Sequence, residues 1–375
     1  MFRTSNRRRR NIIIAVVGLL CVFFWLRIGP FEVPRRIHPT AFDLTSADAF
    51  GFITLEEAKD FCRGYRWRPY PRRDRRRKVY DLFLINGELD WVEIRLNELK
   101  DHVDYFVIVE SALSFTKNAK PLHMKENWAQ FTPFHKQIIY RELNNTGFSS
   151  NIPWDWEDRQ RNALFDQVFP YLSGERLPNT GDVILVSDVD EIPRPATLKV
   201  LRNCDFPRRL TLRSVFYYYS FQWLHRGDEW EHPQATFFEG LTKTILPVNL
   251  RNGDGGLPIL KQLEKEDLWS AAWHCSSCFA TLEEMVNKIM SFSHQGWNKP
   301  EFREPASLAR RVRNGLDMFD REGQVYDRVD GNTDIPAYLK EIGGQKKFSY
   351  MLNRDGDNAG FRDYTEQIQL HGGNS

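Results

Sequence analysis

Four short, mainly apolar runs in the middle of the chain restrict the fold more than any other feature. Amphipathic stretches lie between them, such as 88–103 and 156–172, where apolar residues recur every three or four positions. Near-continuous apolar runs suit strands buried on both faces, and strands that alternate with helices form a mostly parallel sheet. The sequence therefore predicts an α/β fold with helices on both faces of that sheet. The runs are VYDLFLI (79–85), DYFVIVE (104–110), QIIYREL (137–143) and DVILVSD (182–188).

The pattern changes after Pro195. Residues 208–224 are rich in aromatic and β-branched side chains, which is typical of antiparallel strands. Thr281 and Glu284 form the spacing of a capping box, which predicts the start of a helix. We therefore expect an antiparallel and helical part after the parallel sheet. One globular domain is expected over 78–350, followed by a tail over 351–375.

The N-terminal segment has the pattern of a membrane anchor. Four arginines, Arg7 to Arg10, precede an apolar run from Ile12 to Leu26. That run alone is short for a bilayer span, which takes about 20 residues, but 11–31 is long enough. Because basic residues hold their side of a span in the cytoplasm, we expect a cytoplasmic tail (1–10), a type II signal anchor (11–31) and a lumenal remainder. The alternative is a cleaved signal peptide.

Residues 32–77 are expected to form an Arg-rich stem. Residues 1–78 hold 18 Lys and Arg against 7 Asp and Glu, which leaves 34 and 43 of the whole-chain totals of 52 and 50 for the rest. The nearly balanced chain thus combines a basic N-terminal segment with an acidic domain. Because the basic run lies in the stem, nucleic acid is not an expected partner, whereas membrane headgroups or a processing protease are.

The cysteines and one sequon fit a lumenal domain. Disulfides form in that compartment, and Cys275 and Cys278 are expected to belong to a structural disulfide, although the pairing cannot be read from the sequence. A four-cysteine zinc site would require Cys62 and Cys204 to converge on them, which we do not expect. Asn144 begins the sequon NNT and is a candidate N-glycosylation site.

The fourth run leads directly into three acids, Asp188, Asp190 and Glu191. In an open parallel sheet, ligands bind beyond the carboxyl ends of the strands, and these acids lie at such an end. Two carboxylates in a D-x-D spacing suit Mg²⁺ or Mn²⁺, ions that take further ligands from water and substrate phosphates. The pattern therefore indicates a divalent metal that binds a diphosphate substrate. The alternative is a solvated turn whose acids cap the next helix.

Five segments together resemble glycosyltransferase family 17, over about residues 78–350. The resemblance implies a GT-A-like nucleotide-sugar fold in the Golgi. It implies inverting, metal-dependent transfer of N-acetylglucosamine from UDP-GlcNAc to a mannose of an N-linked glycan, in β-1,4 linkage. The segments are YDLFLINGELDWVEIRLNEL (80–99), FVIVESALSFTKNAKPL (106–122), WEDRQRNAL (156–164), ILVSDVDEIPRP (184–195) and WHCSSCF (273–279).

The chain departs from the family pattern in its Arg-rich stem and its compact length, so the acceptor is less constrained than the reaction class. Two alternatives stay open at this point. One is transfer of another UDP-sugar to a glycan. The other is a catalytically silent sugar-binding protein with the same fold.

The resemblance also suggests roles for the acids. In similar GT-A enzymes the second Asp of the motif contacts the ion, which implies this role for Asp190. The first Asp, here Asp188, reaches the ion through water or holds the ribose. His274 is a candidate third metal ligand, although a lone His is more often a core residue. The candidate donor-binding residues are Asn86, Gly87, Glu88, Glu110, Lys120, Arg159, Arg161 and Asp188.

An inverting transfer requires a general base for the acceptor hydroxyl. Among the acids after the metal motif we select Asp254, because the glycines around it permit close approach of substrate, and then Glu239. Aromatic residues of 217–219, together with Trp223 and Trp230, are candidates for an acceptor platform. Core packing is the alternative for each of these rings.

Overall fold

The computed structural model describes residues 51–341 and 346–365. The predicted cytoplasmic tail (1–10), the signal anchor over 11–31 and residues 32–50 of the stem lie outside these residues. Residues 351–365 of the predicted C-terminal tail belong to the fold, because Ala359 and Phe361 are buried in one core cluster with Leu308. Within the described ranges, no helix combines the length and the apolar character that crossing a bilayer requires.

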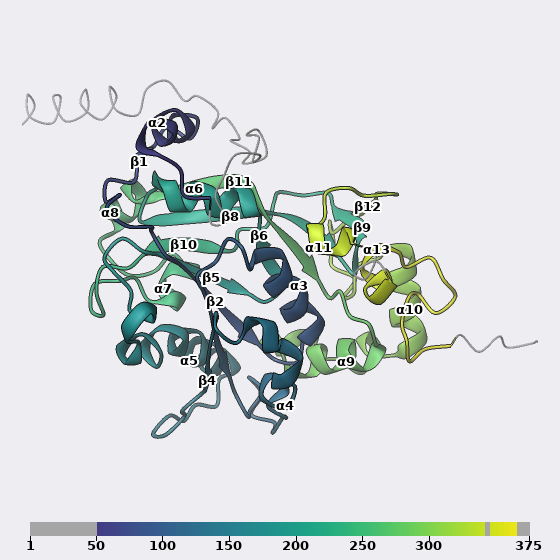
Figure 1. Cartoon of the computed structure of the whole chain (residues 1–375). Helices are drawn as coiled ribbons and strands as arrows, with labels where there is room; N and C mark the ends of the chain where they lie inside the picture. The colour runs from purple at the N-terminus through teal and green to yellow at the C-terminus, as the bar shows by residue number, and fades with distance from the viewer. Residues whose placement is uncertain (1–50, 342–345, 366–375) are drawn as a thin grey trace, which may run out of the picture. The chain divides into compact units, whose positions relative to one another are not determined.

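A mixed sheet forms the centre of the domain (Figure 1). Its first half is parallel, in the spatial order β4-β3-β2-β5, and its second half continues through β10, β8, β9 and β12 with antiparallel pairing. β11 pairs with β8 in parallel and with β6 in antiparallel orientation. The α/β prediction is confirmed, including the change to antiparallel pairing after Pro195. The strands are β1 Arg68–Pro69, β2 Val79–Ile85, β3 Tyr105–Glu110, β4 Ile138–Glu142, β5 Val183–Asp188, β6 Glu191–Pro193, β7 Cys204–Asp205, β8 Arg209–Tyr218, β9 Ser220–His225, β10 Gln234–Phe237, β11 Lys265–Ser276 and β12 Tyr326–Arg328.

Helices cover both faces of the parallel strands, which explains why their sequences are nearly continuous apolar runs. All seven residues of β2 are buried. Alternate β2 residues pack with Leu164 and Phe165 of α5, and on the other face Arg95 of α3 pairs with Asp81 at 2.6 Å. Figure 1 shows α3 and α5 flanking these strands. The α-helices are α2 Leu55–Arg63, α3 Leu89–Leu99, α4 His123–Glu126, α5 Pro153–Asp166, α6 Pro195–Asn203, α7 Pro247–Arg251, α8 Pro258–Leu263, α9 Leu282–Ser291, α10 Pro305–Asn314, α11 Ala337–Lys340 and α13 Ser349–Leu352.

The folded part begins before the predicted boundary at residue 78, which corrects the stem for residues 51–77. Cys62 of α2 forms a disulfide with Cys204, and β1 pairs with β7. Arg77 is buried and donates to the carbonyl oxygens of Leu201 (2.7 Å) and Cys204 (2.8 Å), at the end of α6. Carbonyls at a helix end lack partners within the helix, so a buried guanidinium satisfies them.

The same segment brings part of the basic charge onto the acidic domain. Arg75 pairs with Asp182 at 3.0 Å, and Arg76 pairs with Asp104 at 2.5 Å. A run of arginines in a sequence normally indicates a solvated segment. Here its partners lie more than 25 residues further along the chain, so local composition did not reveal them.

We predict that Cys62→Ser lowers the free energy of unfolding by about 2–5 kcal/mol, because the disulfide closes a long loop of the unfolded chain (142 residues of sequence separation). Denaturant unfolding without reductant measures this loss. Glu56→Ala is the control on the same helix, since its pair with Lys59 is exposed and contributes at most about 1 kcal/mol. Equal stability of both variants and the wild type would show that the segment before β2 is dispensable.

Candidate active site

The acidic cluster lies at the carboxyl edge of the parallel strands. β5 ends at Asp188, and β6 begins at Glu191 after a two-residue turn that contains Asp190. Because β2, β3 and β5 are parallel and in register, their carboxyl ends share this edge. It is the edge at which open α/β sheets bind ligands.

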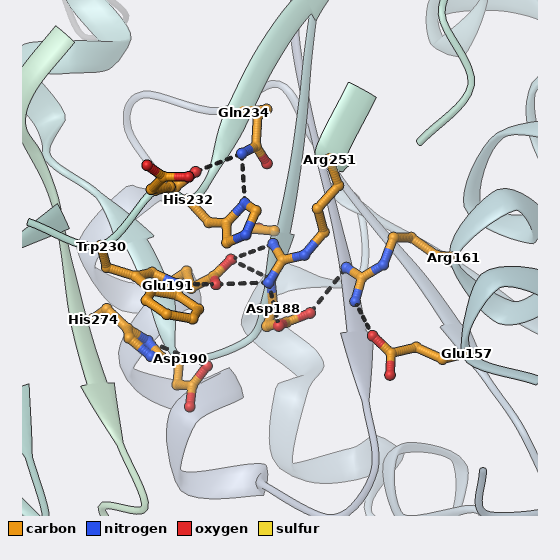
Figure 2. A network of polar contacts seen from close by, with 12 residues as sticks. Glu157, Arg161, Asp188, Asp190, Glu191, Trp230, His232, Gln234, Arg251 and His274 are labelled. Carbon is orange, nitrogen blue, oxygen red and sulfur yellow. Dashed lines mark hydrogen bonds and ion pairs between the residues drawn. The ribbon is translucent and has the colours of Figure 1, made fainter. Parts of the chain in front are cut away.

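Two arginines hold Asp188 (Figure 2). Arg161 of α5 donates to Oδ1 at 2.9 Å, and Arg251 of α7 donates to Oδ2 at 2.7 Å. Arg161 also donates to Glu157 at 2.8 Å, and both guanidinium groups are nearly or fully buried from solvent. Burial would raise the pKa of Asp188, but the two arginines outweigh it and lower the pKa below its usual value. Asp188 is therefore a fixed, ionised carboxylate.

Glu191 is fully buried and shares Arg251. Arg251 Nη1 donates to its Oε2 at 2.8 Å and Nη2 to its Oε1 at 2.9 Å, while the indole of Trp230 donates to Oε1 at 2.8 Å. Burial opposes its ionisation, but Arg251 holds the pKa of Glu191 well below the ordinary value. Burial and Arg251 together lower the pKa of neighbouring His232 to about 4, so this imidazole is neutral near pH 7.

Asp190 differs from its two neighbours because no arginine holds it. Its side chain is largely buried, and its contacts are Lys288 of α9 (Nζ to Oδ2, 3.5 Å) and His274 of β11 (Nδ1 to Oδ1, 3.7 Å). Burial raises the pKa of Asp190, with partial opposition from Lys288 and His274. Of the three acids, it has the weakest protein partners.

The sheet register places His274 beside the motif. His274 is paired with Glu191 across β11 and β6, and its ring is stacked against Phe216 (5.0 Å) and Trp230 (5.3 Å). Its Nδ1 is buried and has no hydrogen-bond partner. A buried ring nitrogen without a partner is costly unless a ligand or ion completes it.

These observations test the fit of a divalent ion. Two ligands each roughly 2.1 Å from one ion lie about 3.0–4.2 Å apart, for angles between a right angle and a straight line. The 3.7 Å between Asp190 Oδ1 and His274 Nδ1 falls in that range. Both oxygens of Asp188 accept hydrogen bonds from arginine, and its predicted role, through water to the ion or to the ribose, stays a prediction. No group of three or more His, Cys, Asp and Glu side chains in the described ranges is arranged to hold a metal.

The predicted donor-binding residues divide into two groups. Asn86, Gly87 and Glu88 follow β2 at the same edge, where the Glu88 carboxylate accepts from the Asn86 and Gly87 amides, both at 2.9 Å. Lys120 donates to the Asn86 carbonyl at 2.8 Å and therefore lies with them. These residues and Arg161 gather at the carboxyl edge.

Glu110 and Arg159 form the second group. Glu110 also ends a strand at this edge, 3.9 Å from Lys120, but its carboxylate is enclosed, whereas Arg159 lies on another face of α5. Glu110 is fully buried and accepts from the Met124 amide (3.0 Å) and the Tyr140 hydroxyl (2.8 Å), so it stabilises the start of α4. Arg159 donates to the Asn144 carbonyl at 3.0 Å. Residues two apart on a helix point in nearly opposite directions, so Arg159 faces away from the acids that Arg161 contacts.

The structure separates one of the two candidate bases from the acids. Glu239 follows β10 at the opposite edge, level with the start of β5, and pairs with Arg208 at 2.6 Å. Asp254 lies in the exposed loop after α7, three residues beyond Arg251. Its role stays a prediction.

Most of the expected aromatic platform is core. Tyr217, Tyr218, Tyr219 and Trp223 are buried, in agreement with the core alternative. Trp230 is 37% exposed and contacts Glu191, so it is the member of that set that reaches the site.

Three site residues were not found from the sequence. Arg251 lies three residues before Asp254, the acid that the sequence analysis selected. Its helix is held by a hydrogen bond from the Val248 amide to the Asn162 side chain of α5 (3.1 Å). Lys288 follows the predicted capping box, on the helix that it opens. Glu157 accepts from Ser293 Oγ at 2.5 Å. Only the fold brings these side chains together.

The structure contains two disulfides in the described ranges. Cys275 pairs with Cys278, directly after His274, and Cys62 pairs with Cys204. The first bridge closes the end of the strand that carries His274. Asn144 of the sequon is exposed, as a glycosylation site requires.

Comparison with known proteins adds a family. The family model described as Glycosyltransferase family 17 matches residues 52–352. β-1,4-Mannosyl-glycoprotein 4-β-N-acetylglucosaminyltransferase of Homo sapiens is 25% identical over 309 residues, covering 74% of this chain and 55% of that protein. The Rattus norvegicus enzyme of the same name is 25% identical over 308 residues, covering 74% and 54%. The chain thus spans about half the length of the curated relatives it matches.

Two solved structures show a distant likeness. A mannosyltransferase from Pyrobaculum calidifontis, in complex with GDP-Man and Mn²⁺, is 10% identical, covers 78% of this chain and 76% of its own, and has a TM-score of 0.31. An inositol-1-phosphate CTP transferase from T. maritima is 11% identical, covers 57% and 96%, and has a TM-score of 0.27. A likeness this distant gives no information about the donor, the acceptor or the metal of this chain.

Proposed function

The chain belongs to glycosyltransferase family 17, and from this premise we propose that it transfers N-acetylglucosamine from UDP-GlcNAc to a mannose of an N-linked glycan. The transfer would invert the anomeric centre and form a β-1,4 linkage. Relatives that carry the name of such an enzyme support this choice of donor and acceptor.

One observation carries the proposal: Asp190 and the partnerless Nδ1 of His274 face each other at 3.7 Å beyond the end of β5. These two groups would hold a divalent ion, Mn²⁺ or Mg²⁺. When bound, the ion would neutralise the negative charge that develops on the departing diphosphate. Asp190 supplies a carboxylate that is not engaged by arginine, and His274 supplies a ring whose orientation is fixed by its contacts with Phe216 and Trp230.

The remaining residues would position the donor. Arg161 and Arg251 hold Asp188 in one orientation, and the Asp188 side chain is 36% exposed. An ionised, oriented carboxylate at this edge is suited to accept a hydroxyl hydrogen bond from the donor. Asn86, Gly87 and Lys120 occupy the neighbouring strand end and would line the nucleoside side of the site.

A donor screen with Mn²⁺ tests the proposed function. We expect the full-length protein to add one N-acetylhexosamine to a mannose-containing N-glycan with UDP-GlcNAc, to act weakly on other UDP-sugars, and to stop with EDTA. Mass spectrometry of the glycan measures the addition. Preference for a different UDP-sugar would show that UDP-GlcNAc is not the donor. Absence of both transfer and donor hydrolysis would favour a silent sugar-binding protein.

We also propose that the domain resides in the Golgi lumen, held by the anchor over 11–31. The two disulfides and the exposed sequon support an oxidising compartment. In sealed microsomes the domain should resist added protease. Asn144→Gln should remove one N-linked glycan, seen as the loss of one glycosidase-dependent shift in molecular mass. Digestion of the domain without detergent would contradict this orientation.

A further inference from the structure

Lys288 has no role in the assignments above, and its environment sets it apart from the other cations of the cluster. Arg161 and Arg251 each contact two carboxylates at 2.7–2.9 Å. Lys288 contacts one carboxylate oxygen at 3.5 Å, and its side chain is 29% exposed. Its ammonium also lies 5.2 Å from the ring of Phe279, and the carboxylates of Glu88 and Asp188 add to the negative field around it. Of the three cations, Lys288 is therefore the one that can change partners while the arginine pairs of Asp188 and Glu191 stay intact.

The helix that carries Lys288 is firmly placed. Thr281 and Glu284 cap its start, and the Asp363 carboxylate accepts from the Leu282 and Glu283 amides at 2.8 and 3.0 Å. Its apolar residues Leu282, Met285 and Ile289 are buried in a hydrophobic cluster that also contains residues of α10. At its other end, Ser291 accepts from Asn86 Nδ2 at 3.0 Å, which joins α9 to the end of β2. The backbone of Lys288 is thus held in place, while its four-carbon side chain can turn the ammonium toward a ligand.

The balance of charge indicates what that ligand is. Glu157, Asp188, Asp190 and Glu191 face three cations, Arg161, Arg251 and Lys288, and the two arginines are already shared among three of the acids. A divalent ion at Asp190 would compete with the ammonium for that carboxylate. Once displaced, the ammonium would remain within reach of any anion bound at the ion.

We propose that Lys288 neutralises Asp190 in the free protein and transfers to the diphosphate of the nucleotide donor when a divalent ion occupies Asp190. This inference rests on the proposed function, because it takes a nucleoside diphosphate as the ligand. Lys288 is thus a second binding group for the diphosphate, next to the ion. It also lowers the affinity for the ion when nucleotide is absent, which couples ion binding to donor binding.

Lys288→Met tests the proposal, since it keeps side-chain length and removes the charge. In isothermal titrations of the full-length protein with Mn²⁺ present, we expect UDP to bind about tenfold to a hundredfold more weakly, because one charge-assisted contact is lost. Uridine should bind as in the wild type. Mn²⁺ alone should bind more tightly, by roughly tenfold, because the competing ammonium is gone.

Two further variants keep the test decisive. Lys299→Met removes a lysine of the exposed pair with Glu301 and should leave all three affinities unchanged. Lys288→Arg keeps the charge and should restore most of the UDP affinity. Unchanged UDP binding in Lys288→Met, equal weakening of UDP and uridine, or weaker Mn²⁺ binding would overturn the proposal. Normal UDP binding and transfer by Lys288→Met would overturn this inference alone, whereas a wild type that binds no UDP with Mn²⁺ would overturn the proposed function as well.

Discussion

Asp190→Asn is expected to remove most transfer activity, by about a thousandfold, while the protein stays folded. An ion on the leaving diphosphate contributes several kcal/mol to the transition state, and each 1.36 kcal/mol is a factor of ten in rate. Burial raises the pKa of Asp190, so its environment stabilises the charge of this carboxylate less than an aqueous environment does. Replacing the carboxylate by a neutral amide of similar size should therefore cost little stability.

Two measurements check this result. The wild type should gain stability from Mn²⁺ with UDP, by about 2.7 kcal/mol when the ligand is at a hundred times its dissociation constant. Asp190→Asn should lose that gain and the turnover of UDP-GlcNAc together. Asp327→Asn, which removes an exposed carboxylate paired with Arg226, is the matched control and should behave like the wild type. A full Mn²⁺-dependent shift with near-normal turnover in Asp190→Asn would show that the acids form an ordinary turn.

Arg251→Met is expected to lower the free energy of unfolding by about 3–5 kcal/mol at pH 7. Arg251 is the main counter-charge of the fully buried Glu191 and one of two for Asp188. Removing one partner of a buried pair leaves an uncompensated charge in a low dielectric, and this accounts for the size of the effect. Chemical denaturation measures the loss. Arg226→Met, at an exposed pair that solvent screens, is the control and should unfold at nearly the same denaturant concentration as the wild type.

The loss in Arg251→Met should depend on pH, with a sign that follows from Glu191. Arg251 holds the pKa of Glu191 well below 4.5, so this carboxylate stabilises the wild type above that pH and loses its contribution as the pH falls. Without the arginine the Glu191 carboxylate protonates more readily, and the cost of burying its charge disappears. The stability difference between variant and wild type should therefore shrink from pH 7 to about pH 4.5.

A companion variant separates charge from shape. Arg251→Met with Glu191→Gln should recover part of the stability that the single variant loses, because no buried anion remains at Glu191. A loss that is the same at both pH values, and that Glu191→Gln does not reduce, would mean that Arg251 acts through packing.

The helices and strands of the N-terminal half were predictable because their signals are local. The predicted runs 79–85 and 182–188 became β2 (Val79–Ile85) and β5 (Val183–Asp188) almost without change. α5 ends at Asp166, where 172 was expected, because a 3-10 turn that contains Pro170 follows it. The spacing of apolar residues and the position of turn residues determine where these elements begin and end. The end of β5 in turn places the acids that follow it.

The site itself could be predicted only in part. Asp188, Asp190 and Arg161 lie where the sequence placed them, but Glu239 lies at the opposite edge and Glu110 is a buried capping group. Both failures have the same cause: a carboxylate in a sequence does not show its partner. Arg208 and the Met124 amide, which engage these two acids, depend on pairings that the local pattern does not encode.

Local sequence was enough to predict the alternation of strands and helices and the acids beyond β5, because both depend on residues that are close neighbours in the chain. The tertiary structure decided which acids are engaged. Arg251 reaches Asp188 from 63 residues away, so arginine competes with an ion for this carboxylate. The pairing of β11 with β6 places His274 beside Asp190, 84 residues earlier, and α9 adds Lys288 from 98 residues away. Such contacts follow from strand register and helix packing, which the whole buried core determines together, and no local stretch of sequence contains them.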